Sequence, residues 1–446
     1  MRKLSALIGF TALTALSTPS LAASTLTVLH SFDLNPNTGD GAYPVAPMLM
    51  DEAGNLFTTT TGGGSQQNCP GGCGTVVELQ PPGTGQKNWT ETLLHMFQGS
   101  TADGSLPEAG LVADSTGNLY TTTASGGAAA LGTVVELSPP SNGQTSWAET
   151  VIYNFQGGTD GANPTASLLA DAAGNFYTTT SAGGASGYGT IVMLTPPGNG
   201  QTAWTESVLY TFAHPKDGAQ PMAALIADAA GNLYTTTSTG GTGKGPCFGD
   251  RNNRDGCGTV IELLRPAKPK GKWNEAVLYN FQGGTDGAIP LAGLLADAAG
   301  NLYTTTNVGG SDVKCYLKLQ GCGTVVELSP PAGGEGPWND TVLYVSNKTT
   351  NLPRSSLLAD AAGNFYTTGV ESIFKLAPPP GGNTGWTETV LQTFSQKKQS
   401  DGYAPAAGLI ADSAGTLYTT TAAGGSSGSG TVIALSGSGF VTPSKP

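Results

Sequence analysis

The phrase DAAGNLYTTT occurs at residues 228–237 and again, unchanged, at residues 297–306. Close variants occur at five more places, and the copies are separated by 63, 57, 57, 69, 63 and 52 residues. The seven copies begin at Asp51, Asp114, Asp171, Asp228, Asp297, Asp360 and Asp412. Repetition at such intervals indicates an array of one supersecondary unit rather than a single irregular core.

Each copy is surrounded by four short segments with the composition of β-strands. In the third unit they read ASLLAD, NFYTTT, GTIVML and ESVLY, and each is bounded by Gly, Pro or Asp. The 66 glycines and 29 prolines of the chain suit frequent turns. Seven units of four strands predict an all-β fold, a seven-bladed β-propeller.

The two ends of the array test whether it closes. The segment TLTVLHSF at 25–32 matches the fourth strand of a unit, whereas the last unit stops after its third strand, GTVIAL. The N-terminal strand is therefore expected to complete the last blade, which pairs two otherwise exposed strand edges. A linear solenoid is the alternative, but it gives no reason to divide one unit between the two ends.

Residues 1–22 have the pattern of an export signal. Arg2 and Lys3 precede an apolar run, and Ser20-Leu21-Ala22 supplies small residues before a cleavage point. A transmembrane helix is the alternative, but the run is shorter than the roughly 20 residues needed to span a bilayer. We expect a secreted, extracellular or periplasmic, monomeric protein with no membrane insertion, a propeller at 23–437 and a short flexible tail at 438–446. Without Arg2 and Lys3, 17 basic residues face 31 acidic ones, so we expect no nucleic acid as a partner.

Units of the form DAAGNLYTTT…GG…GTVVEL resemble the GloVer tandem repeat of secreted bacterial proteins. The D-x-x-G-N-L-Y portion is also similar to the repeats of NHL-type and gluconolactonase-type propellers. The resemblance covers essentially the whole chain after the signal and implies an exported propeller, but it implies no common activity. A gluconolactonase-like enzyme would need carboxylates and amides around a metal in the channel. Here the channel strands, such as ASLLAD and AGLIAD, offer Ala, Gly and Ser, which argues against lactonase activity.

Most acidic residues obey the repeat. The aspartate of D-x-x-G-N is expected to cap a tight turn. Six more aspartates stand in D-G-x-x-P, and six acids follow the Trp that opens a fourth strand, as Glu91 does. The D-G aspartates could converge on a cation, but turn chemistry is favoured. His30 and His95 take the place of Tyr in the fourth strand, so we interpret them as structural and expect no metal and no cofactor.

The cysteines come in local pairs: Cys69 with Cys73, Cys247 with Cys257, and Cys315 with Cys322. In an exported chain with an even count, three disulfides are the simplest interpretation, and zinc ligation is the alternative. Each pair lies in the loop between second and third strands, and that loop should emerge on the same face as the D-G-x-x-P loop.

One position at the channel mouth varies between units. The residues directly after the Pro of each unit are Val45, Glu108, Thr165, Met222, Leu291, Arg354 and Ala406. Blades 4 and 5 have long loops rich in basic residues, and blade 6 has a shortened one, so we expect a notch at blades 4 to 6. Its candidate ligand-binding residues are Lys244, Arg251, Arg254, Lys314, Tyr316, Lys318 and Arg354, together with Glu108 at the mouth. Solvated charges on loops that are free to vary are the alternative interpretation.

The sequence leaves two hypotheses about the function open. The first is an exported binding or surface module for an anionic glycan or surface polymer. The second is a carbohydrate-active enzyme, a lyase using Tyr316 with Arg254 or Arg354, or a hydrolase using Asp250 and Asp255. The fold by itself does not decide between them.

Overall fold

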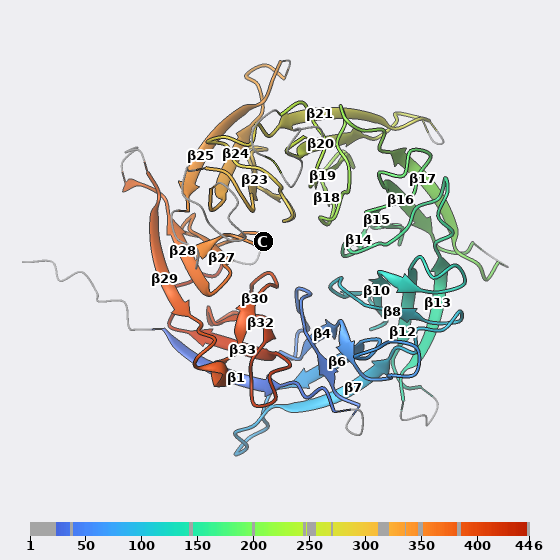
Figure 1. Cartoon of the computed structure of the whole chain (residues 1–446), viewed down its shortest axis with the longest axis vertical. Coiled ribbons are helices and arrows are strands. Elements are labelled where there is room, and N and C mark those ends of the chain that lie inside the picture. Colours follow the sequence, from blue (N-terminus) through green and yellow to red (C-terminus); the bar gives the residue numbers. More distant parts are fainter. Residues whose placement is uncertain are drawn as a thin grey trace, which may run out of the picture.

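The computed structural model describes residues 24–35, 39–141, 146–198, 201–243, 247, 256–268, 271–310, 321–334, 336–346, 351–380 and 385–443. These residues form seven antiparallel sheets of at least four strands, which stand side by side in a ring (Figure 1). The predicted seven-bladed β-propeller is confirmed. Within the described residues, no helix is long and apolar enough to cross a bilayer.

The strands of each blade run in chain order from the axis of the ring to its rim. Blade 1 contains β3 (Leu49–Met50), β4 (Leu56–Thr60), β6 (Thr75–Gln80) and β7 (Thr90–Met96), and blade 2 contains β9 (Val112–Ala113), β10 (Leu119–Thr123), β12 (Thr133–Ser138) and β13 (Ala148–Asn154). Blade 3 contains β14 (Leu169–Ala170), β15 (Phe176–Thr180), β16 (Thr190–Thr195) and β17 (Thr205–Thr211), and blade 4 contains β18 (Ile226–Ala227), β19 (Leu233–Thr237), β20 (Thr259–Leu264) and β21 (Asn274–Asn280). Blade 5 contains β22 (Leu295–Ala296), β23 (Leu302–Thr305), β24 (Thr324–Ser329) and β25 (Asn339–Val345), and blade 6 contains β26 (Leu358–Ala359), β27 (Phe365–Thr368), β28 (Ser372–Ala377) and β29 (Thr387–Thr393).

Blade 7 joins the two ends of the chain, as predicted. It contains β31 (Ile410–Ala411), β32 (Leu417–Ala423), β33 (Thr431–Ser436) and, on the rim, β1 (Thr25–Ser31). The pairing of β1 with β33 runs from Thr25 opposite Ser436 to Ser31 opposite Thr431, and Figure 1 shows the N-terminal strand beside the C-terminal blade. A further strand, β30 (Tyr403–Pro405), follows the short 3₁₀ helix η4 (Gln399–Asp401) and pairs with β32.

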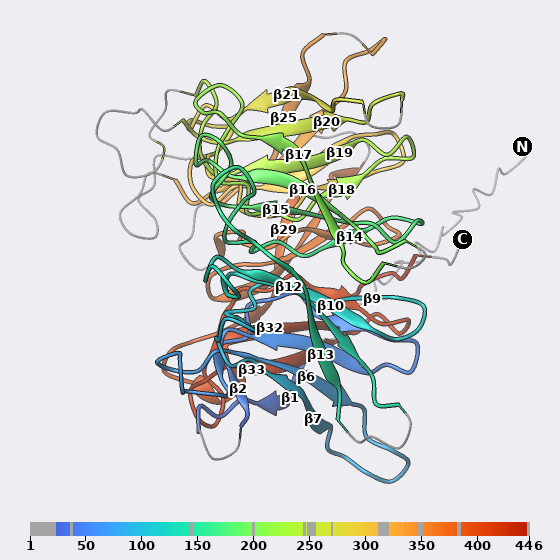
Figure 2. The same ribbon diagram turned by 90° about the vertical axis from the view of Figure 1, so that its right-hand side faces the viewer.

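The predicted grouping of two sets of loops on one face is also confirmed. In blade 1, β2 (Gly41–Ala42) of the entering loop pairs with β5 (Gly62–Gly63) of the loop after the second strand. The next unit repeats this pairing with β8 (Gly104–Ser105) and β11 (Ser125–Gly126). Gly63 has a φ of 77°, and a Cβ there would lie 2.4 Å from the carbonyl oxygen of Asp40. Only glycine permits this approach, and it holds the two loops together on what we call the loop face, where β2 lies in the edge-on view of Figure 2.

The threonines of the repeat connect neighbouring blades. In blade 3, Thr178 donates to the carbonyl of Ala166 in its own blade, and Thr179 donates at 3.2 Å to the carbonyl of Ala223 in blade 4. Thr180 pairs at 2.8 Å with Thr190 on the third strand. The same bond to the next blade is made by the second threonine of every unit: Thr59, Thr122, Thr179, Thr236, Thr305, Thr368 and Thr420. The threonines therefore satisfy buried carbonyls at every blade boundary.

The D-x-x-G-N segments form the expected turns on the opposite face, which we call the turn face. Oδ1 of Asp228 accepts the backbone N–H groups of Ala230 and Asn232, both at 2.9 Å. Oδ2 accepts the side-chain amide of Asn232 and the hydroxyl of Tyr234. Burial alone raises the pKa of Asp228, but these hydrogen bonds stabilise the carboxylate and lower the pKa overall.

The chain after β33 packs across the turn of blade 6. Ser438 and Phe440 are buried, and Phe440 belongs to the same hydrophobic cluster as Tyr366. The backbone N–H of Ala361 donates to the carbonyl of Val441 at 2.8 Å. This part of the expected tail is therefore anchored on the ring.

Candidate functional site

The variable positions at the channel mouth lie together, as the alignment of the repeats predicts. All seven line a cavity of about 150 Å³ on the axis of the ring, together with small residues of the inner strands. Met222 and Leu291 are 39% and 38% exposed, which gives the mouth an apolar side. The hydroxyl of Thr165 is buried and has no hydrogen-bond partner.

Glu108 and Arg354 are the charged residues among these seven positions, all of which are described. Burial raises the pKa of Glu108, so its carboxyl group takes up a proton more readily than an exposed one. The backbone N–H of Arg354 donates to the carbonyl of Thr368 and fixes the entry into blade 6. The mouth thus combines a permanent cation, a carboxyl group that protonates easily and an apolar side.

The loops of blades 4 to 6 differ in length as the sequence indicates. Blade 6 joins β27, which ends at Thr368, to β28, which begins at Ser372, by three residues. The corresponding connections of blades 4 and 5 run from Thr237 to Thr259 and from Thr305 to Thr324. Most of the predicted site lies on these longer loops outside the described residues, so the notch stays a prediction. The candidates that lie outside the described residues are Lys244, Asp250, Arg251, Arg254, Asp255, Lys314, Tyr316 and Lys318.

Two of the predicted disulfides are present, Cys69–Cys73 and Cys247–Cys257. Cys322 is also disulfide-bonded, and its expected partner, Cys315, lies outside the described residues. The zinc alternative is therefore ruled out for the first two pairs. The bridges stiffen loops on the loop face, which fits an oxidising compartment.

A second polar cavity lies on the turn face between blades 3 and 4. It has a volume of about 550 Å³ and is lined by Tyr177, Trp273, Arg265 and Lys268 among other residues. This cavity was not predicted from the sequence, although the run RPAKPKGK at 265–272 concentrates basic residues in one segment. Its cations make it a useful counterpart to the mouth in binding experiments.

Each blade boundary also brings together acids that the repeat keeps apart in the sequence. Between blades 3 and 4, the hydroxyl of Tyr210 donates to Oδ2 of Asp217 at 2.7 Å. Glu275, the acid after the Trp of blade 4, faces the same aspartate. Burial, and then repulsion by Asp217, raise the pKa of Glu275 to about 7. The pair therefore holds one proton below about pH 7.

The arrangement recurs around the ring with changes in the residues. Between blades 2 and 3, burial and repulsion by Asp160 raise the pKa of Glu206 to about 7. Between blades 5 and 6, where the D-G motif is absent, Tyr344 donates to Glu388 at 2.9 Å. Backbone N–H groups donate to the D-G aspartates, for example that of Ala213 to Asp217 at 2.8 Å, which supports the turn role predicted for them. Recurrence at successive boundaries indicates a structural role for these carboxyl pairs.

At two boundaries histidine takes the place of tyrosine, as predicted: His30 lies between blades 7 and 1, and His95 lies between blades 1 and 2. His95 packs edge-to-face on Phe97 with ring centroids 4.7 Å apart, and Tyr153 packs in the same way on Phe155 at 5.1 Å. Here the residue facing Asp103 is Glu149, and burial, followed by repulsion from Asp103, raises its pKa to about 7. Three separate classes of repeat position contain His95, Asp103 and Glu149, so their meeting was not predicted from the sequence.

The fold and the residues around its axis define a seven-bladed propeller built from one repeated unit. The profile of the Gloeobacter/Verrucomicrobia repeat matches residues 14–248 and 65–314, and the chain belongs to this family. This confirms the resemblance noted in the sequence. No curated protein sequence matches the chain significantly.

Solved propellers are similar to the chain over most of its length. Virginiamycin B lyase from Staphylococcus aureus is 12% identical, with a TM-score of 0.49, and the match covers 92% of this chain and 99% of the lyase. A gluconolactonase from Xanthomonas campestris is 11% identical, with a TM-score of 0.41 and coverage of 95% and 93%. PorZ, a surface component of the type-IX secretion system of Porphyromonas gingivalis, is 14% identical, with a TM-score of 0.46 and coverage of 91% and 47%. The family assignment rests on the repeat profile alone.

Proposed function

We propose that this protein is an exported binding module that recognises an anionic glycan or surface polymer on its loop face, with Arg354 at the channel mouth as an anchor. The observation that carries the proposal is the composition of the mouth cavity. Arg354 supplies a cation for a carboxylate or sulfate group, and the hydroxyl of Thr165 supplies an unsatisfied hydrogen-bonding group. Met222 and Leu291 supply an apolar surface for a sugar face.

Glu108 modulates this site in the proposal. Because burial raises its pKa, its negative charge is lost at a higher pH than that of an exposed glutamate. Protonation removes the repulsion between Glu108 and an anionic ligand bound at Arg354. Binding is therefore expected to become tighter as the pH falls.

The short connection between β27 and β28 supports extension of the site over the rim of blade 6. A polymer held at Arg354 would leave the mouth there. Contacts of the polymer with Lys244, Arg251, Arg254, Lys314, Tyr316 and Lys318 stay a prediction from the sequence. Export is part of the proposal and rests on the signal-like residues 1–22 and on the disulfides. The enzyme alternative depends on Tyr316 with Arg254 or Arg354, or on Asp250 and Asp255. Of these residues Arg354 alone lies within the described part of the chain, and the mouth around it supports binding, which is the function proposed.

The test is titration of the mature protein with polyuronate and sulfated oligosaccharides at low and physiological salt, with mass spectrometry of the ligand afterwards. Arg354→Glu is expected to weaken binding of a responding ligand at least tenfold, and Lys268→Glu, the same charge change at the turn-face cavity, is expected to change it less than twofold. If Lys268→Glu abolishes binding and Arg354→Glu does not, the ligand binds on the turn face and the proposed site on the loop face is wrong. New cleavage products would make the protein an enzyme.

A further inference from the structure

The boundary between blades 1 and 2 holds a cluster of three side chains that the proposed function does not use. His95 comes from β7 of blade 1, Asp103 from the connection between the blades, and Glu149 from β13 of blade 2. One ligand atom of each residue, a ring nitrogen or a carboxylate oxygen, lies within 4.8 Å of the other two. The three residues therefore converge on one point from two blades.

The hydrogen bonding of this cluster is incomplete. Nε2 of His95 and Oε1 of Glu149 are buried and have no hydrogen-bond partner. Nε2 of His95 is 3.6 Å from Oδ1 of Asp103, which is too long for a hydrogen bond. At the boundary of blades 3 and 4, by contrast, Tyr210 donates to Asp217 at 2.7 Å. Histidine thus replaces a satisfied donor by an unsatisfied nitrogen, and such a buried group calls for a partner.

The distance between Nε2 of His95 and Oδ1 of Asp103 suits two ligands of one metal ion. In a tetrahedral site with metal–ligand bonds of about 2.0–2.1 Å, ligand atoms stand about 3.3 Å apart. The distance of 3.6 Å between these two atoms of His95 and Asp103 is close to this ligand–ligand distance. The ligand oxygen of Glu149 lies within 4.8 Å of the other two ligand atoms. A side-chain rotation that moves this oxygen by up to about 1.5 Å therefore brings the third ligand to the tetrahedral distance.

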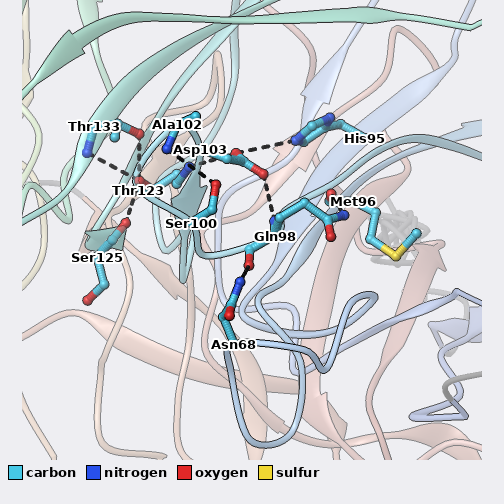
Figure 3. A network of polar contacts seen from close by, with 11 residues as sticks. Asn68, His95, Met96, Gln98, Ser100, Ala102, Asp103, Thr123, Ser125 and Thr133 are labelled. Atoms are coloured by element: carbon cyan, nitrogen blue, oxygen red, sulfur yellow. Dashed lines mark hydrogen bonds and ion pairs between the residues drawn. The ribbon is translucent and has the colours of Figure 1, made fainter. Parts of the chain in front are cut away.

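The ligands are also held in place from outside, as metal ligands are. Asp103 is 6% exposed, and its two oxygens accept the backbone N–H groups of Gln98 and Gly104, both at 2.6 Å. The amide of Asn68 donates to the carbonyl of Gln98 at 2.7 Å, which ties the Asp103 loop to the loop closed by the Cys69–Cys73 disulfide. Figure 3 shows this network, with His95 directed at Asp103.

The same residue types recur at the boundary of blades 7 and 1. His30 packs on Phe32 with ring centroids 4.7 Å apart, and its Nε2 lies 3.4 Å from Oδ2 of Asp40. Nε2 of His30 and Oε1 of Glu91 are buried without a hydrogen-bond partner. Acid pairs also face tyrosine at other boundaries, where Oε1 of Glu206 and of Glu275 likewise lacks a partner, so the unsatisfied imidazole nitrogen is what distinguishes the two histidine boundaries. The three ligand atoms of the His30 group do not all lie within 4.8 Å of one another, so this group is more open than the first.

We propose that His95, Asp103 and Glu149 bind a divalent first-row transition-metal ion of the Zn²⁺ or Mn²⁺ class, and that His30, Asp40 and Glu91 form a second, looser site of the same kind. One imidazole and two carboxylates suit these ions, whereas Ca²⁺ prefers oxygen ligands throughout. Water completes the coordination. The first ion joins blade 1 to blade 2, and the second joins blade 1 to blade 7, which contains the N-terminal strand.

The experiment uses variants that restore the tyrosine of the other repeats, His95→Tyr and His30→Tyr, because these keep a hydrogen-bond donor to the aspartate. The mature protein is equilibrated with ZnCl₂, dialysed, and its bound zinc measured by mass spectrometry. The wild type should retain up to two ions per chain, His95→Tyr one fewer, and the double variant none. The melting temperature should rise with zinc by a few degrees in the wild type and stay unchanged in the double variant.

A second readout guards against a variant that folds poorly. Co²⁺ bound by nitrogen and oxygen ligands should give visible absorption in the wild type that is reduced in Glu149→Gln, a substitution that keeps the shape of the side chain. Absence of metal retention in the wild type would overturn the proposal. Equal retention by the wild type and the double variant would overturn it as well, because the metal would then bind elsewhere.

Discussion

The hydroxyl of Thr179 in blade 3 donates a hydrogen bond of 3.2 Å to the carbonyl oxygen of Ala223 in blade 4. The same carbonyl accepts a second hydroxyl, that of Thr235 in blade 4, at 3.1 Å. Thr179→Val keeps the shape of the side chain and removes the bond between the blades. We expect a loss of about 1 kcal/mol in the free energy of unfolding, because the carbonyl retains one of its two donors.

Denaturant unfolding measures this loss, with Thr205→Val as the control. Thr205 begins β17 of the same blade and is exposed, so its substitution should change stability by less than about 0.5 kcal/mol. Equal effects of the two substitutions would show that the bond between blades 3 and 4 contributes nothing to stability.

Closure of the ring by β1 gives the second prediction. Phe32 follows β1 and is fully buried, as Phe97 is at the matching position after β7 of blade 1. If the N-terminal strand is an integral part of blade 7, Phe32→Ala should destabilise the protein by about 3–5 kcal/mol, and Phe97→Ala should do so by a similar amount. Thermal unfolding of the two variants side by side measures this. A harmless Phe32→Ala beside a harmful Phe97→Ala would contradict closure.

The third prediction compares two turns with the same sequence motif. Asp360 is 6% exposed because the C-terminal segment covers it, whereas Asp297 is exposed. Both accept hydrogen bonds from the turn backbone, from an Asn and from a Tyr. Asp360→Ala leaves these donors unsatisfied away from water, so it should cost about 2–3 kcal/mol, and Asp297→Ala should cost about 1 kcal/mol.

Chemical denaturation of the two variants decides this comparison, and deletion of residues 438–446 provides a control. In the truncated chain the turn of blade 6 is open to water, and the two alanine substitutions should then have similar effects. A persistent difference would mean that the C-terminal segment does not cause it.

The fourth prediction concerns pH and the carboxyl pairs between blades. The pKa values of Glu206 and Glu275 are raised to about 7 by burial, and then by Asp160 and Asp217, from an ordinary value of 4.5. Between these values the folded protein binds more protons than the unfolded chain, so stability falls as pH rises from about 4.5 to about 7. The aspartates of the turns do not oppose this trend, because the lowered pKa of Asp228, for example, places its titration below this window.

The melting temperature of the wild type should therefore be lower at pH 8 than at pH 5, and Glu206→Gln with Glu275→Gln should reduce the difference. Glu52→Gln, the same substitution at an exposed residue, serves as the control and should leave the difference unchanged. A wild type that is more stable at pH 8 than at pH 5 would contradict the prediction.

The repeat by itself determined the blade, the number of blades and the closing strand. Four strand segments, a turn signal and a fixed order lie within each unit of about 60 residues, so a local pattern carries them. The pairing of β1 with β33 was predictable because the divided unit leaves two complementary strand edges. The ring of Glu108, Thr165 and Arg354 at the mouth followed from the same alignment, because equivalent positions of a cyclic array face a common axis.

Contacts between blades were decided by the tertiary structure alone. His95, Asp103 and Glu149 stand in three different repeat classes, and they meet because the outer strand of one blade packs beside that of the next. Whether a carboxyl group there is paired, buried or left without a donor depends on this packing, which no pattern within a single unit records. Burial and the facing charge come from a neighbouring unit, and for that reason the chemistry at the blade boundaries emerged only from the folded ring.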